Sequence, residues 1–230
     1  DLAHEQQMLY RTIGRNPEWI PEVLAAMPED HAPVAATHLA ARRAIAGIGH
    51  GDPPVDVPAW EIIEPLPAEE LRRLYEEAGA ATGIEWTFLA AINLVETGFG
   101  RIDGLSTAGA QGPMQFLPST WAEVSDGDID DPRDAIPAAA RYLVRRGAPA
   151  DMHDALWGYN TSNEYVAAIT HYATLFRDDP RSFLATHSWE IHYSSAIGDL
   201  WFPVGYRRDV PVPATEHVAD APWSAPPEPG

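Results

Sequence analysis

Residues 90–101 read AAINLVETGFGR, an almost entirely apolar run that closes with one carboxylate, Glu96. From Ile84 onward the side chains are apolar on nearly every helical face, a pattern typical of a buried helix. Gly98 and Gly100 follow, and glycine commonly ends helices in left-handed backbone. Burying a carboxyl group is costly unless the group is paired, neutral or used. The stretch therefore predicts a helical core with either a functional acid or a solvated glutamate at its surface end.

Two effects raise the pKa of a carboxyl group in the predicted position of Glu96. Burial disfavours the charged form, and the C-terminal end of a helix carries partial negative charge. A carboxyl group that keeps its proton near neutral pH is able to donate that proton to a leaving oxygen. Glu96 is therefore our candidate for a general acid.

Helical patterns dominate the rest of the chain and strand patterns are scarce, which predicts a mainly α fold. We expect an N-terminal helical region and a linker rich in glycine and proline over residues 1–58. The main helical domain follows over residues 59–208, where Pro67 and Gly83 bracket a well-signalled amphipathic helix. Residues 209–230 form a proline-rich tail that we expect to be extended or disordered.

The composition restricts the classes of ligand. The chain carries 15 Lys and Arg residues, all of them Arg, against 34 Asp and Glu, for a formal net charge of −19. Such a chain is a poor match for nucleic acid, because phosphate binding needs clustered cations. No apolar run reaches the roughly 20 residues that a membrane span needs. No leader is visible at Asp1, so we expect any signal peptide or anchor to be absent from this chain.

Two further segments carry polar and aromatic residues suited to a sugar site. Residues 106–121 read STAGAQGPMQFLPSTW, where Ser106 and Gln115 offer hydrogen-bonding groups and Met114 and Phe116 offer apolar surface to a sugar ring. Residues 155–160 read ALWGYN and end in Tyr159 and Asn160. Each residue also has a structural interpretation, as core, loop or helix-end hydrogen bond. Trp157 and Trp189 are further candidates for stacking on sugar.

Together these segments resemble the soluble-type lytic transglycosylases of the lysozyme-like superfamily, especially secreted actinobacterial members. The resemblance covers roughly residues 69–173, and its motifs are Glu96-Thr97-x-Phe99, Ser106-x-x-Gly109-Ala110-x-Gly112-x-Met114-Gln115-x-x-Pro118-x-Thr120, and Tyr159-Asn160. The chain departs from the family at Thr97, Pro113 and Gly158, where members often carry Ser, Leu and Ala. None of these departures removes a reacting group.

The resemblance implies a lysozyme-like helical fold and cleavage of the β-1,4 bond between N-acetylmuramic acid (MurNAc) and N-acetylglucosamine (GlcNAc) in peptidoglycan. Glu96 would protonate the glycosidic oxygen and then act as base toward the C6 hydroxyl of MurNAc, which leaves a 1,6-anhydro sugar. Ser106, Gln115, Tyr159 and Asn160 match positions that hold the glutamate or line the sugar site. We expect peptidoglycan strands as the partner, a monomer outside the cytoplasm, and neither cofactor nor metal.

The sequence leaves two alternatives open. Ordinary glycosidases use two carboxylates about 5 to 9.5 Å apart, yet residues 104–122 contain no Asp or Glu. This gap favours a transglycosylase over a lysozyme-type muramidase, because an intramolecular attack needs no activated water. A non-catalytic peptidoglycan-binding domain is the other alternative, although such a domain has no need of a protonated acid. Among the nine histidines, His187 and His192 are five residues apart, which does not match the helical metal spacing.

Overall fold

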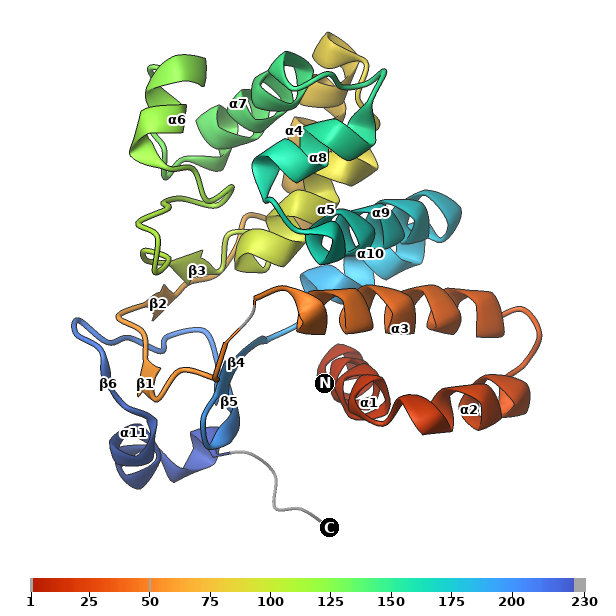
Figure 1. Ribbon diagram of the computed structural model, residues 1–230, viewed down its shortest axis with the longest axis vertical. Helices are drawn as coiled ribbons and strands as arrows, with labels where there is room; N and C mark the ends of the chain where they lie inside the picture. The colour runs from red at the N-terminus through yellow and green to blue at the C-terminus, as the bar shows by residue number, and fades with distance from the viewer. Residues whose placement is uncertain (1, 50, 226–230) are drawn as a thin grey trace.

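Helices account for most of the structure, as the sequence predicts. The computed structural model describes residues 2–49 and 51–225 (Figure 1). Its α-helices in chain order are α1 (Leu2–Arg15), α2 (Ile20–Ala26), α3 (Ala32–Gly47), α4 (Ala68–Thr82), α5 (Trp86–Thr97), α6 (Pro118–Val124), α7 (Pro132–Arg145), α8 (Met152–Tyr159), α9 (Asn163–Asp178), α10 (Pro180–His187) and α11 (Ala214–Asp220). Two short 3-10 helices, η1 (Pro17–Trp19) and η2 (Pro222–Ser224), complete them. Within the described ranges, no helix is both long enough and apolar enough to span a bilayer.

Several helix ends lie where local signals predict them. The left-handed Gly83 ends α4, and the side chains of Asp151 and Ser162 accept hydrogen bonds from the first turns of α8 and α9. Helix α5 is buried around most of its circumference, as its apolar sequence predicts. The helix that carries Glu96 therefore runs through the middle of the protein.

Strands form three small antiparallel pairs in the described chain, more than the sequence pattern indicated. β1 (Asp56–Val57) pairs with β6 (Val212–Pro213), and β2 (Glu61–Ile62) pairs with β3 (Ile102–Asp103). The longest pair is a hairpin of β4 (Ile191–Ser195) and β5 (Gly198–Phe202), in which Ile191 lies opposite Phe202. The β2–β3 pair fixes the chain that leaves α5 against the segment that precedes α4.

One large core surrounds α5 and α9. Its fully buried aromatic side chains come from three different helices and the loop after α5: Tyr75, Phe99, Tyr165, Tyr172, Phe176 and Phe183. Helix α3 lies along α9, and α1 lies along α3, so the N-terminal helices cover one side of this core (Figure 1). Helices α3 and α9 approach each other so closely at Gly47 that any larger residue there would collide with the side chain of Glu164.

The C-terminal region corrects one expectation. Residues 209–225 are not extended or disordered, because β6 pairs with β1 and α11 follows it directly. A second, smaller core joins this region to the β4–β5 hairpin, with Val57, Ile62, Ile191, Leu200, Phe202, Tyr206 and Ala214 buried in it. The sequence signal was hidden because prolines flank a helix of only seven residues. Residues 226–230 of the predicted tail lie outside the described residues.

Candidate active site

Glu96 lies in the last turn of α5 and is partly buried. Its Oε1 atom accepts a hydrogen bond of 2.7 Å from the hydroxyl group of Tyr165 at the start of α9. Burial raises the pKa of Glu96 to about 7, and the hydrogen bond from Tyr165 opposes that rise. The fully solvated glutamate that the sequence left open is therefore excluded. At neutral pH this carboxyl group is able both to donate and to accept a proton.

The backbone after Glu96 turns sharply through three consecutive left-handed residues. Gly98, Phe99 and Gly100 have φ values of 61°, 67° and 87°. This conformation costs a residue with a β-carbon about 1–2 kcal/mol, so Phe99 is the unusual member. Its ring is 1% exposed and meets the rings of Phe183 and His187 at centroid distances of 5.5 and 5.6 Å. Burial of this ring stabilises the turn that ends α5 directly beyond Glu96.

A buried hydrogen-bond network ties the end of α5 to the loop that follows. The carbonyl oxygen of Pro113 accepts hydrogen bonds from Thr97 Oγ1 at 2.7 Å and from Asn93 Nδ2 at 2.8 Å. Asn93 Oδ1 accepts in turn from the hydroxyl of Tyr75 at 2.5 Å, and Thr97 Oγ1 accepts from the backbone N–H of Gly100. These contacts fix the loop of residues 106–117 relative to the helix turn that holds Glu96.

Ser106 and Gln115 are engaged within that loop. The Ser106 hydroxyl accepts hydrogen bonds from the backbone N–H groups of Ala108 and Ala110. The Gln115 side-chain amide donates to the carbonyl of Gly112, and Gln115 itself has a left-handed backbone with φ of 49°. Strained backbone of this kind is typical of functional loops. The structure therefore gives both residues a role in shaping the loop.

Met114 and Phe116 require a correction. Their side chains are 0% and 3% exposed and lie in the main core, so they do not offer a surface to a sugar ring. Met114 takes part through its backbone instead, because its carbonyl oxygen accepts a 2.7 Å hydrogen bond from the Tyr159 hydroxyl. The rings of Tyr159 and Tyr165 are nearly parallel, with their centroids 6.3 Å apart. Tyr159 therefore connects the loop of residues 106–117 to the tyrosine that contacts Glu96.

The three remaining candidates, Asn160, Trp157 and Trp189, differ in how far their side chains are exposed to a ligand. Asn160 follows α8 directly and is partly buried, with its backbone N–H bonded to the Leu156 carbonyl. Trp157 is 46% exposed and remains available to a ligand. Trp189 is 5% exposed and packs against the ring of His38, which corrects the expectation that it stacks on sugar.

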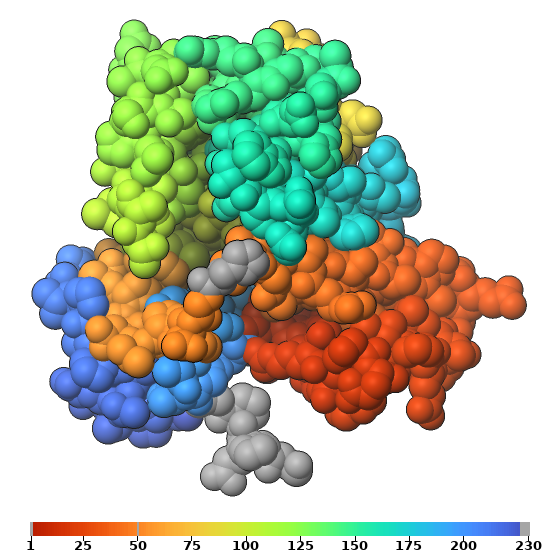
Figure 2. All heavy atoms as spheres, viewed as in Figure 1, coloured from red at the N-terminus to blue at the C-terminus, as the bar shows by residue number. Residues whose placement is uncertain are grey.

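A hollow opens above the end of α5. Figure 2 shows it between the green segment that leads into α6 and the teal segment around α8 and the start of α9, with the orange end of α3 along its lower rim.

A pocket of about 170 Å³ contains Glu96 and is also lined by Arg11 and Arg42 from α1 and α3. Glu190 is the other acidic residue that lines it. The N-terminal helices thus contribute directly to the surroundings of the candidate acid.

Comparison with known proteins finds one family that resembles the middle of this chain. Residues 73–173 match the family described as the transglycosylase SLT domain. Over this range the chain is therefore similar to the transglycosylase SLT domain. Its mainly helical structure is consistent with the lysozyme-like fold that this similarity implies. No solved structure matches the chain with significance.

Two curated relatives are similar to this chain. One is the membrane-bound lytic murein transglycosylase F 1 of Alkalilimnicola ehrlichii, 25% identical over 191 residues, which are 69% of this chain and 38% of that protein. The other is the membrane-bound lytic murein transglycosylase F of Thiobacillus denitrificans, 29% identical over 122 residues, which are 50% of this chain and 26% of that protein. The chain thus matches well under half the length of either relative.

Tyr165 is a candidate site residue that the sequence analysis did not single out. It lies in the segment EYVAAITHYA, which the resemblance already included. A tyrosine in the first turn of a helix otherwise has the pattern of a core residue, and its ring is indeed 1% exposed. Only the fold shows that its hydroxyl reaches Glu96, 69 residues earlier.

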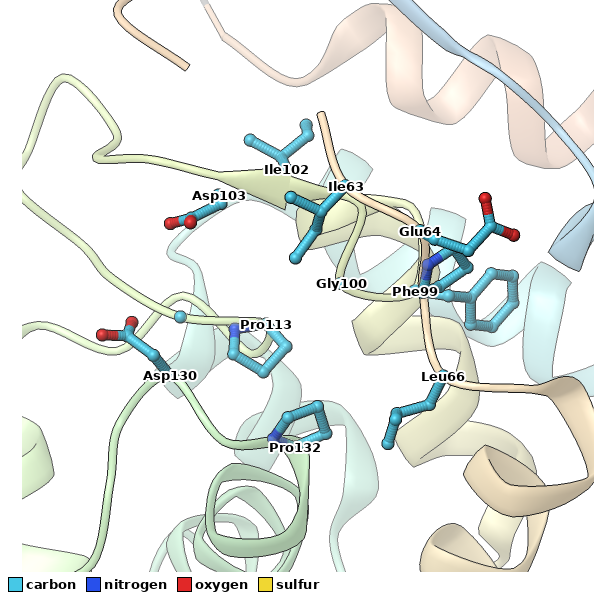
Figure 3. Close-up of a pocket in the computed structure, with 12 residues that line it drawn as sticks. Ile63, Glu64, Leu66, Phe99, Gly100, Ile102, Asp103, Pro113, Asp130 and Pro132 are labelled. Carbon is cyan, nitrogen blue, oxygen red and sulfur yellow. The ribbon is translucent and has the colours of Figure 1, made fainter. Parts of the chain in front are cut away.

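A second pocket lies next to the pocket that contains Glu96, on the side of the β2–β3 pair. It measures about 220 Å³, and Ile102 lines both pockets. Figure 3 shows Asp103 and Asp130 on one side of it and Glu64 on the other. Burial and the nearby charges of Asp128 and Asp103 raise the pKa of Asp130. Over residues 2–49 and 51–225, no group of three His, Asp or Glu side chains is placed to hold a metal ion.

Proposed function

We propose that this chain is a peptidoglycan lytic transglycosylase that cleaves the β-1,4 bond between MurNAc and GlcNAc. The observation that carries the proposal is Glu96, at the end of α5 in an SLT domain, with a pKa raised to about 7 by burial. The names of the two relatives, both lytic murein transglycosylases, support the same substrate. Because peptidoglycan lies outside the cytoplasmic membrane, we propose that the chain acts there.

In the proposed reaction Glu96 changes role between two steps. The protonated carboxyl group donates its proton to the glycosidic oxygen, so the bond between that oxygen and C1 of MurNAc breaks. The resulting carboxylate then takes the proton of the C6 hydroxyl of the same MurNAc as its oxygen bonds to C1. Glu96 regains its proton, no water is consumed, and the product carries a 1,6-anhydro ring. A pKa near the working pH suits both steps.

Tyr165 and Tyr159 support these steps from α9 and α8. The Tyr165 hydroxyl donates to Glu96 Oε1, so it stabilises the carboxylate that exists between the two proton transfers. Tyr159 packs against the Tyr165 ring and fixes the loop through its bond to the Met114 carbonyl. We propose that Ser106, Gln115 and Asn160 line the sugar site together with Tyr159, the first two through the shape they give to the loop.

The products of digestion test the proposal. Purified peptidoglycan is incubated with the protein, and the released muropeptides are analysed by mass spectrometry. A transglycosylase releases anhydro-muropeptides, lighter by one water than the reducing-end products of a hydrolase. We expect Glu96→Gln to lower the rate about 10²- to 10⁴-fold, the usual contribution of a general acid. Glu85→Gln, at the exposed opposite end of α5, is the matched control and should keep full activity.

Two outcomes would support the alternatives. Reducing-end products indicate a lysozyme-type muramidase, and Glu190, the second acid of the pocket, is then the residue to replace. Retention on insoluble cell wall with no released sugar indicates a binding domain. Full activity of Glu96→Gln contradicts both enzymatic mechanisms.

A further inference from the structure

Arg42 places a guanidinium group without a carboxylate partner in the pocket that contains Glu96. Arg42 is partly buried on α3, and no acidic side chain of the described chain lies within ion-pair distance of it. A buried or half-buried cation normally has an anionic partner, since the desolvation of its charge is otherwise uncompensated.

Several N–H groups around the same pocket also lack acceptors. The Nε atoms of Arg11 and Arg42 and the Nε1 atom of Trp189 are buried and make no hydrogen bond with any described residue. All three residues line the pocket, and Arg11 and Trp189 are 6% and 5% exposed. Tyr172 also lines the pocket and its hydroxyl interacts with Arg42, but it leaves these three atoms without an acceptor. Buried donors are nearly always satisfied in folded proteins, so three such donors around one cavity indicate that an acceptor binds there.

The local charge balance favours an anion. Arg11 and Arg15 both pair with the single carboxylate of Asp199. Arg42 lies close enough to Arg11 that its charge, after burial, helps to lower the pKa of Arg11 to about 10. An anion bound beside the two guanidinium groups would relieve this repulsion and accept charge-assisted hydrogen bonds.

One acceptor adds a second requirement for the ligand. The Oε2 atom of Glu190 lines the pocket, is buried and has no described partner. The backbone of Glu190 is held in place, because its N–H donates to Gln7 Oε1 and its carbonyl accepts from Gln7 Nε2. A ligand that presents a carboxylate together with an amide N–H or hydroxyl group would satisfy both kinds of atom.

We propose that Arg42 and Arg11 form a subsite for a carboxylate carried by the muramoyl residue whose linkage Glu96 cleaves. The inference rests on the proposed function. The lactyl ether of MurNAc ends in a free carboxylate when no peptide is attached, and otherwise it carries a stem peptide with amide N–H groups and its own carboxylates. Both sources are bonded to the sugar ring adjacent to the scissile bond, which agrees with one pocket containing Glu96, Arg11 and Arg42. The N-terminal helices thereby take part in substrate selection.

Three substrates distinguish the lactyl carboxylate from the carboxylates of the stem peptide. They are soluble glycan chains with stem peptides, the same chains with their peptide carboxylates amidated, and chains stripped of peptide. We expect Arg42→Gln to raise KM about tenfold on the peptide-bearing chains, as for loss of a hydrogen bond to a charged group, and to have little effect on the amidated ones. A tenfold rise on the stripped chains assigns the subsite to the lactyl carboxylate instead. Arg42→Lys should recover part of the affinity because it keeps the charge.

The control is Arg43→Gln, the neighbouring exposed arginine of α3, which makes no ion pair within the described chain and should leave KM unchanged. Circular dichroism and thermal unfolding check that each variant is folded. Equal KM values for Arg42→Gln and wild type on all three substrates, or an equal rise on all three, overturn the proposal.

A binding measurement tests the carboxylate subsite independently of the proposed transglycosylase reaction. In the Glu96→Gln background, calorimetry with a peptide-bearing disaccharide reports affinity without turnover. A tenfold loss of affinity on adding Arg42→Gln supports the subsite even if no sugar is ever released. Unchanged affinity overturns it even if the wild-type protein proves to be a transglycosylase.

Discussion

The hydroxyl of Tyr165 lies 2.7 Å from Oε1 of Glu96, so a residue of α9 lowers the proton affinity of a residue of α5. Burial raises the pKa of the carboxyl group to about 7, and this hydrogen bond limits the rise. The bond forms because α5 and α9 pack side by side in the main core. The carboxyl group is therefore held near its midpoint of titration at neutral pH, as the proposed acid and base roles of Glu96 require.

Replacing Tyr165 by Phe should move the pH dependence of activity. In the proposed mechanism the wild-type rate should fall as pH rises through about 7, because Glu96 then loses the proton that it is expected to donate. Tyr165→Phe removes the bond that lowers the pKa, so the alkaline limb should shift to higher pH while the maximal rate falls about tenfold. Profiles of kcat/KM against pH measure both effects. Tyr193→Phe, which loses a remote bond to the Asp56 carbonyl, should leave the profile unchanged.

Glu96→Gln should make the protein more stable at alkaline pH. The pKa of Glu96 is about 7 in the folded protein against an ordinary value of 4.5, so the folded state binds this proton more tightly than the unfolded chain. Folding stability therefore decreases as pH rises from 4.5 through 7, by up to about 3 kcal/mol. Glutamine does not ionise, so the variant should exceed wild type by up to that amount at pH 8. Urea unfolding at pH 4.5 and pH 8 checks this, and an equal difference at both pH values would contradict it.

His38 should make the protein sensitive to acid. Its ring is 0% exposed and stacks on Tyr10 at 4.4 Å, and burial lowers its pKa from 6.5 to about 4. The unfolded chain takes up the proton first, so stability is complete above pH 6.5 and is lost as pH falls toward 4, by up to about 3 kcal/mol. His38→Phe should flatten the dependence of the unfolding free energy on pH between 6.5 and 4. An unchanged slope would show that the ring is not buried in solution.

Thr97→Val should weaken the connection between α5 and its loop. The substitution keeps the shape of the side chain but removes the donor to Pro113 and the acceptor for the Gly100 N–H. Leaving these buried groups unpaired should lower the free energy of unfolding by about 1–3 kcal/mol. Thr97→Ser retains the hydroxyl and is the matched control, expected to differ little from wild type. Denaturant titration measures both, and equal values for the two variants would exclude the network.

Much of the fold was predictable because its signals are local. The apolar run before Glu96, the glycines after it and the caps at Asp151 and Ser162 each act within a few residues of the chain. The β4–β5 hairpin and α11 were missed because short elements carry little periodicity and gain their stability from the second core. That core joins segments more than a hundred residues apart, which no local pattern reports.

The candidate site was predictable in its central acid and less so in its surroundings. The position of Glu96 and the direction of its pKa shift follow from the hydrophobic pattern, whereas its partner Tyr165 depends on how helices pack. Met114 and Phe116 were assigned to the sugar site because their side chains offer apolar surface, yet in the fold both are buried in the main core. Arg42 had no signal at all in the sequence, since α3 reaches the pocket only by packing on α9.

The packing of α3 on α9 also bears on how the protein can be divided. Helix α9 is buried on nearly every face, from Tyr165 through Phe176, and residues outside the range that matches the SLT family cover part of it. A recombinant fragment that begins after the linker would leave that stripe of α9 open to water, and we expect it to aggregate. Exchange of SLT domains between proteins would therefore succeed only when the partner supplies a helix that fits this surface.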